Sequence, residues 1–199
     1  MSATPSTMLE LGTALPPFRL PGLDGRMSAS DDCAAAPGLL VAFICPHCPF
    51  VRHIRRGFGR VTADLQQRGL AIVGINSNDE AAFPMDGLDG MREEARDGGY
   101  TFPYLRDESQ DVAKAFRAAC TPDLFLFDAS RRLVYRGQFD SSRPRAAVPV
   151  PVTGEDLLAA ADAVLTGKPV PAPQRPSIGC NIKWKAGQEP RYFTGEAAV

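Results

Sequence analysis

The sequence predicts an α/β protein in which a central mixed sheet is covered by helices on both faces. Two short apolar runs, residues 39–44 and 70–76, have the composition of buried strands. Between them, apolar residues recur with the spacing of one helix face. Two later runs, residues 124–127 and 133–135, are typical of an antiparallel hairpin. This order of elements requires both parallel and antiparallel strand pairs in one sheet.

The first half of the chain supplies a hairpin, a strand and a long helix. Residues 18–20 indicate a short strand that enters a turn at residues 22–26. The strand at residues 39–44 leads into a helix that ends near Gly69, a typical C-cap residue. The apolar face of this helix consists of Val51, Ile54, Phe58, Val61 and Leu65.

Three shorter helices are predicted after the strand at residues 70–76. One covers residues 86–96 and is stopped by a glycine pair, and a short extended piece follows at residues 102–105. Ser109 caps the next helix. The last helix begins near Thr153 and ends at Gly167, after which prolines dominate.

The chain is divided by this pattern into a main domain and an extension. With 199 residues it is long enough for one domain with a sizeable core. We expect residues 1–167 to form that domain. Residues 168–199 are expected to form a proline-rich strap and a C-terminal tail that packs on the domain.

Composition excludes several classes of partner. Hydrophobic residues make up 44% and charged residues 23%, and the net charge is −1, so neither nucleic acid nor an anionic membrane is expected as a partner. No apolar run approaches the ~20 residues that span a bilayer. No secretory signal is visible near the N-terminus, and we expect a cytoplasmic location. Five scattered cysteines are too few for a disulfide scaffold.

The most informative motif is Cys45-Pro46-His47-Cys48, which lies between the strand at residues 39–44 and the following helix. Backbone N–H groups in the first turn of a helix lack partners and favour an anion such as a thiolate. Residues three apart on a helix are close enough to adjust into disulfide geometry. We therefore expect Cys45, exposed at the helix entrance, to attack, and Cys48, one turn inside, to resolve.

The two residues between the cysteines tune the pair. Pro46 suits the first helical turn, where its missing N–H has no cost. His47 can donate a hydrogen bond or positive charge to the Cys45 sulfur. We expect the pKa of Cys45 to be lowered to about 6, which would leave the thiol mostly ionised at neutral pH.

The cysteines have two alternative roles, as metal ligands or as buried apolar residues. A metal site would need two more ligands at suitable spacing, and no second close Cys/His pair exists, so we expect no metal and no organic cofactor. Cys120 and Cys180 are either small buried apolar residues or auxiliary redox thiols, and the sequence leaves both readings open.

Several motifs along the chain carry a family resemblance. They lie at residues 43–49, 75–79, 102–105, 120–123, 135–140 and 176–185. Through them nearly the whole chain resembles the thioredoxin superfamily. It is most similar to the thioredoxin-like proteins grouped with the peroxiredoxins and alkyl hydroperoxide reductases.

The resemblance implies a thioredoxin-like fold with a cis proline facing the cysteine pair. Thr121-Pro122, directly before the strand at residues 124–127, is the matching position. In this reading the Thr121 backbone is presented to an extended substrate segment. The same placement brings Cys120 near the site.

These observations predict a thiol–disulfide oxidoreductase. Cys45 would attack the disulfide of a protein or small molecule, and Cys48 would release the product by exchange. Electrons would come from a partner thiol system. One alternative is a peroxiredoxin-like peroxidase, in which Cys45 becomes a sulfenic acid and Cys48 or Cys120 closes a disulfide. Peroxiredoxins carry Thr or Ser three residues before the reactive cysteine, whereas this chain has Ala42.

A third alternative is of another class. In a redox-sensing interaction protein, oxidation of the cysteine pair would switch the tail or a partner surface. Activity toward disulfides or hydroperoxides separates the two enzymes from the sensor.

Overall fold

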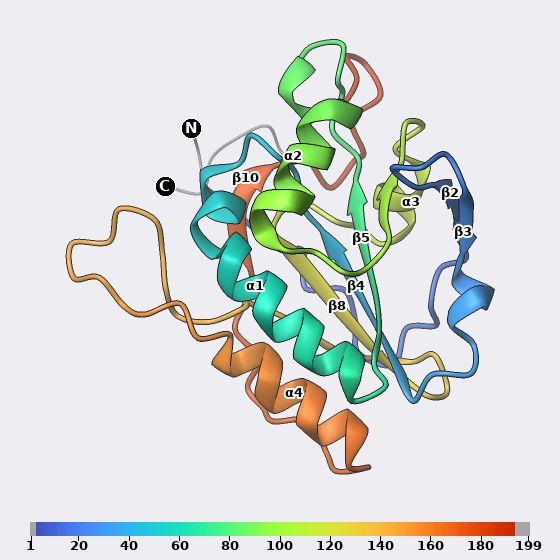
Figure 1. Ribbon diagram of the computed structural model, residues 1–199, viewed down its shortest axis with the longest axis vertical. Coiled ribbons are helices and arrows are strands. Elements are labelled where there is room, and N and C mark those ends of the chain that lie inside the picture. The colour runs from blue at the N-terminus through green and yellow to red at the C-terminus, as the bar shows by residue number, and fades with distance from the viewer. Residues whose placement is uncertain (1–2, 194–199) are drawn as a thin grey trace.

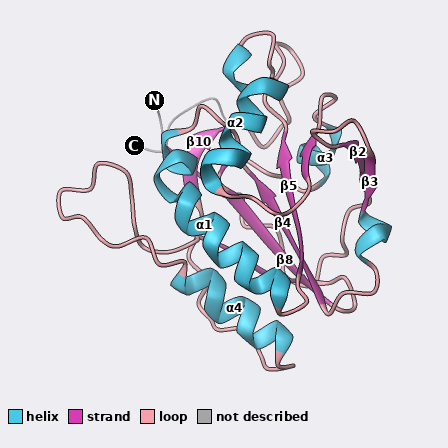
Figure 2. Cartoon of the chain, in the orientation of Figure 1, coloured by secondary structure: helices cyan, strands magenta, loops and turns pink. Residues whose placement is uncertain are grey.

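The computed structural model describes residues 3–193 and has a five-stranded mixed sheet at its centre (Figures 1 and 2). The strand order is β6-β5-β4-β8-β9, with parallel pairs on one side of β4 and antiparallel pairs on the other. The strands are β4 (Gly38–Phe43), β5 (Ala71–Asn76), β6 (Tyr104–Arg106), β8 (Asp123–Asp128) and β9 (Leu133–Gly137). The predicted α/β fold class is confirmed.

Helices cover both faces of this sheet. On one face lie α1 (Pro49–Gln67), α2 (Leu88–Gly98) and α4 (Glu155–Leu165), which share one apolar core. In Figure 1, α1 and α4 lie side by side in front of the sheet. The short helix α3 (Asp111–Ala115) packs in the core on the opposite face.

Burial on both faces explains the continuous apolar run of β4. Side chains alternate between the two faces of a strand. Leu40 and Ala42 accordingly pack in the core beneath α1, while Leu39 and Val41 pack in the core beneath α3. The core that contains Leu40 also contains Ile44, Cys45, Cys48 and Cys180.

Two smaller sheets involve the chain ends. β2 (Arg19–Pro21) and β3 (Met27–Ala29) form the expected hairpin. The second small sheet has the order β1-β10-β7 and was not predicted. It consists of β1 (Ala3–Pro5), β10 (Ile178–Asn181) and β7 (Cys120–Thr121). It brings the tail of the chain next to the segment that precedes β8.

The strap between α4 and β10 is irregular and runs along β9. The Gln174 side chain donates to the carbonyl of Val134 at 2.8 Å and accepts from the Arg136 backbone N–H at 3.1 Å. Such side-chain contacts replace strand pairing in this proline-rich segment. No helix among the described residues is long and apolar enough to cross a membrane.

Three helix starts differ from the prediction. The N-cap residue of α3 is Gln110 and not Ser109, although the Ser109 hydroxyl accepts from the Asp111 backbone N–H at 3.2 Å. α1 begins at Pro49 and not at Pro46. Both prolines suit a first helical turn, but residues 46–47 form a separate turn before the helix. α2 begins at Leu88, two residues after the predicted start. The residues before it form the 3-10 turn η2 (Pro84–Asp86), which leaves Asp86 outside the helix.

Candidate active site

Cys45 follows the central strand β4, and its sulfur is buried. The sulfur lies 3.2 Å from the Thr121 hydroxyl oxygen and 3.9 Å from Nδ1 of His47. Thr121 is 76 residues further along the chain. The fold therefore assembles the surroundings of Cys45 from distant segments.

Cys48 is the N-cap residue of α1, and its sulfur is also buried. As a thiol it donates a hydrogen bond to the Thr121 carbonyl oxygen at 3.0 Å. Cys180, from the tail strand β10, packs in the same core as Cys48. Thr121 thus contacts Cys45 through its hydroxyl and Cys48 through its carbonyl.

The expectation that Cys45 is exposed at the helix entrance is wrong for this reduced structure. Because α1 begins at Pro49, Cys45 lies outside the first turn, and the positive end of the helix is nearest to Cys48. Pro46, expected in the first turn, lies in the preceding turn, is buried, and accepts a hydrogen bond from Nε of Arg52 at 2.8 Å.

The protonation of the pair also differs from the prediction. Burial raises the pKa of Cys45, a contact with Cys48 and the charge of the Asp86 carboxylate raise it further, and only the Thr121 hydroxyl lowers it. Burial raises the pKa of Cys48 as well, but hydrogen bonds with the Cys180 and Cys45 thiols outweigh it and lower that pKa. Negative charge is therefore held best on Cys48 in the closed form.

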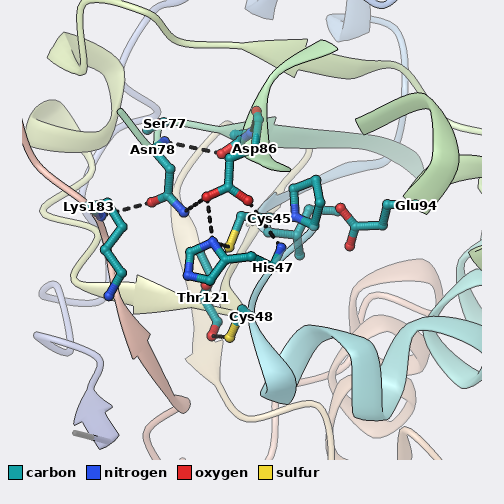
Figure 3. A network of polar contacts seen from close by, with 12 residues as sticks. Cys45, His47, Cys48, Ser77, Asn78, Asp86, Glu94, Thr121 and Lys183 are labelled. Atoms are coloured by element: carbon teal, nitrogen blue, oxygen red, sulfur yellow. Dashed lines mark hydrogen bonds and ion pairs between the residues drawn. The ribbon is translucent and has the colours of Figure 1, made fainter. Parts of the chain in front are cut away.

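His47 is held by a carboxylate that the sequence did not indicate (Figure 3). Nδ1 of His47 lies 2.5 Å from Oδ2 of Asp86, and the His47 backbone N–H donates to Oδ1 at 3.1 Å. Asn78 donates to the same carboxylate at 2.8 Å. Since Asp86 takes the nearest ring nitrogen, His47 is oriented toward Asp86 more strongly than toward Cys45.

The half-exposed side of the site is covered by stacked rings. Phe83 lies parallel to the His47 ring, with 5.4 Å between the centroids and 15° between the planes. The ammonium of Lys183, from the tail, lies 5.5 Å from the centre of the Phe83 ring. The side chain of His47 is 12% exposed, and Phe83 is 37% exposed. This stack separates Cys45 from solvent.

A buried acid lies behind the pair. Glu94 of α2 accepts hydrogen bonds from the hydroxyls of Tyr104 at 2.7 Å and Tyr100 at 3.3 Å. Burial raises the pKa of Glu94 to about 7, and the two tyrosine hydrogen bonds only partly oppose this. The Tyr104 hydroxyl also lies 3.2 Å from the carbonyl of Ile44, the residue before Cys45.

The Thr121–Pro122 peptide bond is cis, as the resemblance implied. A small hollow lined by Phe50, Ile54, Pro122 and Ile178 opens beside it. The backbone of Thr121, however, is already paired with the tail, because Thr121 is the register partner of Cys180 in the antiparallel pair β7-β10. The edge expected for an extended substrate is therefore occupied by the chain itself.

The two remaining candidate thiols differ in position. Cys180 contacts Cys48, whereas the Cys120 thiol donates to the carbonyl of Pro122 at 3.5 Å. Both are buried. Only Cys33, in the 3-10 turn η1 (Ser30–Cys33), is partly exposed, and it lies outside this cluster.

A three-ligand set is also present. Cys45, His47 and Asp86 each offer one ligand atom, and these atoms all lie within 4.8 Å of one another. Sequence spacing could not reveal this set, because Asp86 lies 39 residues from His47. A thiolate, an imidazole and a carboxylate are ligands that zinc accepts. The absence of a bound metal in the working protein stays a prediction.

Comparison with known proteins places the chain in a family. The model of the AhpC/TSA family matches residues 11–136. The chain belongs to the AhpC/TSA family. The AhpC/TSA match includes both Cys45 and Cys48 and the cis proline, but it ends before the tail strand β10. A search of curated proteins found no match.

Solved structures share the fold of this AhpC/TSA chain. A hypothetical protein from Sinorhizobium meliloti is 52% identical, with a TM-score of 0.89 over 92% of this chain and 100% of that one. An uncharacterized conserved protein from Geobacillus kaustophilus is 47% identical, with a TM-score of 0.88 over 94% and 98%. A putative thiol:disulfide interchange protein DsbE from Chlorobium tepidum is 18% identical, with a TM-score of 0.61 over 79% and 99%. The fold is thioredoxin-like.

Proposed function

We propose that the protein is a thiol–disulfide oxidoreductase that uses Cys45 as nucleophile and Cys48 as resolving thiol. The observation that carries this proposal is the placement of the two sulfurs. They pack in one core, and both contact Thr121 beside the cis proline. Membership of the AhpC/TSA family supports redox chemistry at this pair.

The surroundings of the sulfurs decide which one attacks. Cys48 is enclosed by the Thr121 backbone and the tail strand β10. Cys45 instead faces His47, whose side chain is partly exposed. Displacement of the ring stack of His47 and Phe83 would therefore uncover Cys45 first.

The reaction follows from the contact between the thiols. The Cys48 thiolate takes the proton of Cys45, an uphill step because the pKa of Cys48 is lowered and that of Cys45 is raised. The Cys45 thiolate attacks one sulfur of the substrate disulfide, a mixed disulfide forms, and the other substrate sulfur leaves as a thiolate and takes the proton back from Cys48. Cys48 then attacks Cys45 and releases the second thiolate. The substrate gains two electrons and one proton from the pair, the second thiolate takes its proton from solvent, and the pair becomes a disulfide.

The bound substrate would contact the small hollow beside Pro122. Its lining is mixed: Phe50, Ile54 and Ile178 are apolar, and the polar residues include His53, Asp140 and Arg143. It therefore offers both kinds of contact to the side chain next to a substrate cysteine. The disulfide could belong to a protein or to a small molecule. A partner thiol system would return electrons to Cys45 and Cys48.

Reduction of insulin and of glutathione disulfide by dithiothreitol tests the proposal. We expect turnover above the uncatalysed rate, with its loss in Cys45→Ser and in Cys48→Ser. Cys33→Ser is the matched control, because Cys33 lies outside the cluster, and it should keep full turnover. Wild-type turnover in Cys45→Ser would contradict the proposal.

A second candidate function is hydroperoxide reduction. It is favoured by the Thr121 hydroxyl, 3.2 Å from the Cys45 sulfur, and by the burial of both thiols, which small molecules reach more easily than proteins do. The chain has Ala42 where peroxiredoxins place Thr or Ser. Stopped-flow reaction with hydrogen peroxide separates the candidates, since a peroxidase must react far faster than a free thiol. If neither disulfides nor peroxide turn over, the redox-sensing alternative is favoured.

A further inference from the structure

The tail strand β10 holds a third thiol at the redox pair. Cys180 is 1% exposed and stands opposite Thr121 in the β7-β10 ladder. Its side chain packs in the same core as Cys45 and Cys48, and the Cys48 thiol donates to the carbonyl of Thr121, the residue that Cys180 pairs with. The mechanism proposed above uses Cys45 and Cys48 and leaves this thiol without a role.

The close approach of the tail depends on a glycine. A Cβ atom at Gly179 would lie 1.9 Å from the carbonyl oxygen of Thr121, which no side chain could tolerate. Glycine at this position therefore lets β10 lie directly against the peptide that precedes Pro122. The following residue, Cys180, is brought to Cys48 by this backbone contact.

The position of the tail is that of a substrate. In the thioredoxin-like arrangement, an extended substrate pairs with the residue before the cis proline. Here that residue is Thr121, and its partner is Cys180 of the same chain. A cysteine that lies on this edge and contacts one thiol of the pair is placed for thiol–disulfide exchange.

We propose that Cys180 is a third redox thiol that exchanges with the Cys45–Cys48 disulfide. This inference rests on the proposed function. The Cys180 thiolate attacks the Cys48 sulfur, a Cys48–Cys180 bond forms, and the Cys45–Cys48 bond breaks. Cys45 leaves as a thiolate and takes up the proton that Cys180 gave. No external oxidant is consumed, because the disulfide only moves within the protein.

Exchange at Cys180 would also affect the side of the site that holds His47 and Asp86, because the tail contacts that side too. The backbone N–H of Lys183, three residues after Cys180, donates to Oδ1 of Asn78 at 2.8 Å (Figure 3). Asn78 in turn donates to Asp86, which holds His47. A bond that pulls Cys180 toward Cys48 therefore acts on the segment that positions the Asp86 carboxylate.

Cys120 provides a matched comparison. It is as deeply buried as Cys180 and lies on the neighbouring strand of the same small sheet. Its thiol bonds the carbonyl of Pro122 and not another sulfur. Cys120 should therefore take no part in the exchange.

The test maps disulfides after oxidation with diamide, which removes two electrons and two protons from a pair of thiols. The proteins compared are Cys45→Ser alone and combined with Cys180→Ser or with Cys120→Ser. We expect peptide mass spectrometry to find an intramolecular Cys48–Cys180 link in Cys45→Ser. The link should be lost in the double variant that lacks Cys180 and kept in the one that lacks Cys120.

A measurement on the wild-type protein avoids any effect of the substitutions on folding. Partly oxidised protein is alkylated in acid, digested and mapped, and the Cys48–Cys180 peptide pair should appear beside the Cys45–Cys48 pair. The inference is overturned if this pair is missing from the wild type, or if Cys45→Ser forms only dimers or diamide adducts at Cys48.

Failure of the two proposals gives different results. If only the inference fails, wild-type protein still reduces insulin or glutathione disulfide and the Cys48–Cys180 peptide pair is absent. If the proposed function fails, those substrates are not reduced, whatever disulfides diamide produces.

Discussion

The two cysteines of the motif lie three residues apart, yet their surroundings are different. Cys45 lies outside the helix, near the Asp86 carboxylate and behind the partly exposed ring of His47. Cys48 lies at the positive end of α1 and contacts Cys180 of the tail. One side of the pair is acidic and close to solvent, and the other is enclosed and able to hold negative charge.

This difference is produced by segments that are distant in sequence. The turn before α2 brings a carboxylate to the Cys45 side, and the tail strand brings a thiol to the Cys48 side. The motif by itself therefore does not determine which sulfur is the thiolate. While the ring stack of His47 and Phe83 covers the site, negative charge is held on Cys48, and Cys45 is the thiol nearer the substrate.

Replacement of Glu94, the buried acid behind the cysteine pair, should have the largest effect of the changes considered. The quantity affected is the free energy of unfolding. Its pKa rises from 4.5 to about 7 through burial, a difference worth about 3 kcal/mol. Between these pH values the folded protein keeps a proton that the unfolded chain has lost. The free energy of unfolding should therefore fall as the pH rises through this window, and Glu94→Gln should remove that loss.

Urea unfolding between pH 4 and 8 measures this effect. The neighbouring Glu93→Gln is the control, because Glu93 is exposed. Part of the pH dependence should persist in Glu94→Gln, since burial also raises the pKa of Asp123 to about 7. Equal pH dependence in wild type and Glu94→Gln would show that Glu94 does not titrate in this window.

Removal of the Asp86 carboxylate charge, which lies near Cys45, should have a smaller effect, and the quantity affected is the pKa of Cys45. Burial is the main cause of the raised pKa of Cys45, and the Asp86 carboxylate adds to it. Asp86→Asn should lower the pKa of Cys45, because a nearby like charge disfavours the thiolate. Peptide-resolved labelling of Cys45 with iodoacetamide across pH measures this shift.

The control for this change is Asp89→Asn, whose side chain is fully exposed. An upward shift of the Cys45 pKa in Asp86→Asn would contradict this prediction. It would mean that the His47–Asp86 pair as a whole stabilises the Cys45 thiolate.

The sheet could be predicted from the sequence because its signals are local. The predicted strands at residues 39–44 and 70–76 agree with β4 and β5 to within one residue at each end. Burial on both faces makes such strands continuously apolar, so composition is enough to locate them. The cis proline followed from the family resemblance and not from any local pattern.

The site could be predicted only in part because its decisive contacts are long-range. Asp86 was expected to begin a helix, since a proline before an acidic residue is a typical start signal. The 3-10 turn η2 instead turns Asp86 into the site, 39 residues from His47. Likewise no local pattern pairs Cys180 with Thr121, because β10 is short and lacks alternation of polar and apolar residues.

The smallest expected effect concerns access to Cys45. Phe83 stacks on His47, and a stacked aromatic pair contributes about 1 kcal/mol to keeping the site closed. Phe83→Ala should therefore speed iodoacetamide labelling of Cys45 roughly fivefold. Labelling of Cys48 should not change, because the tail covers that sulfur. Met85→Ala, at an exposed position two residues away, is the control. Faster labelling of Cys48 would show that the ring stack protects both thiols alike, and the two sides would then share one route to solvent.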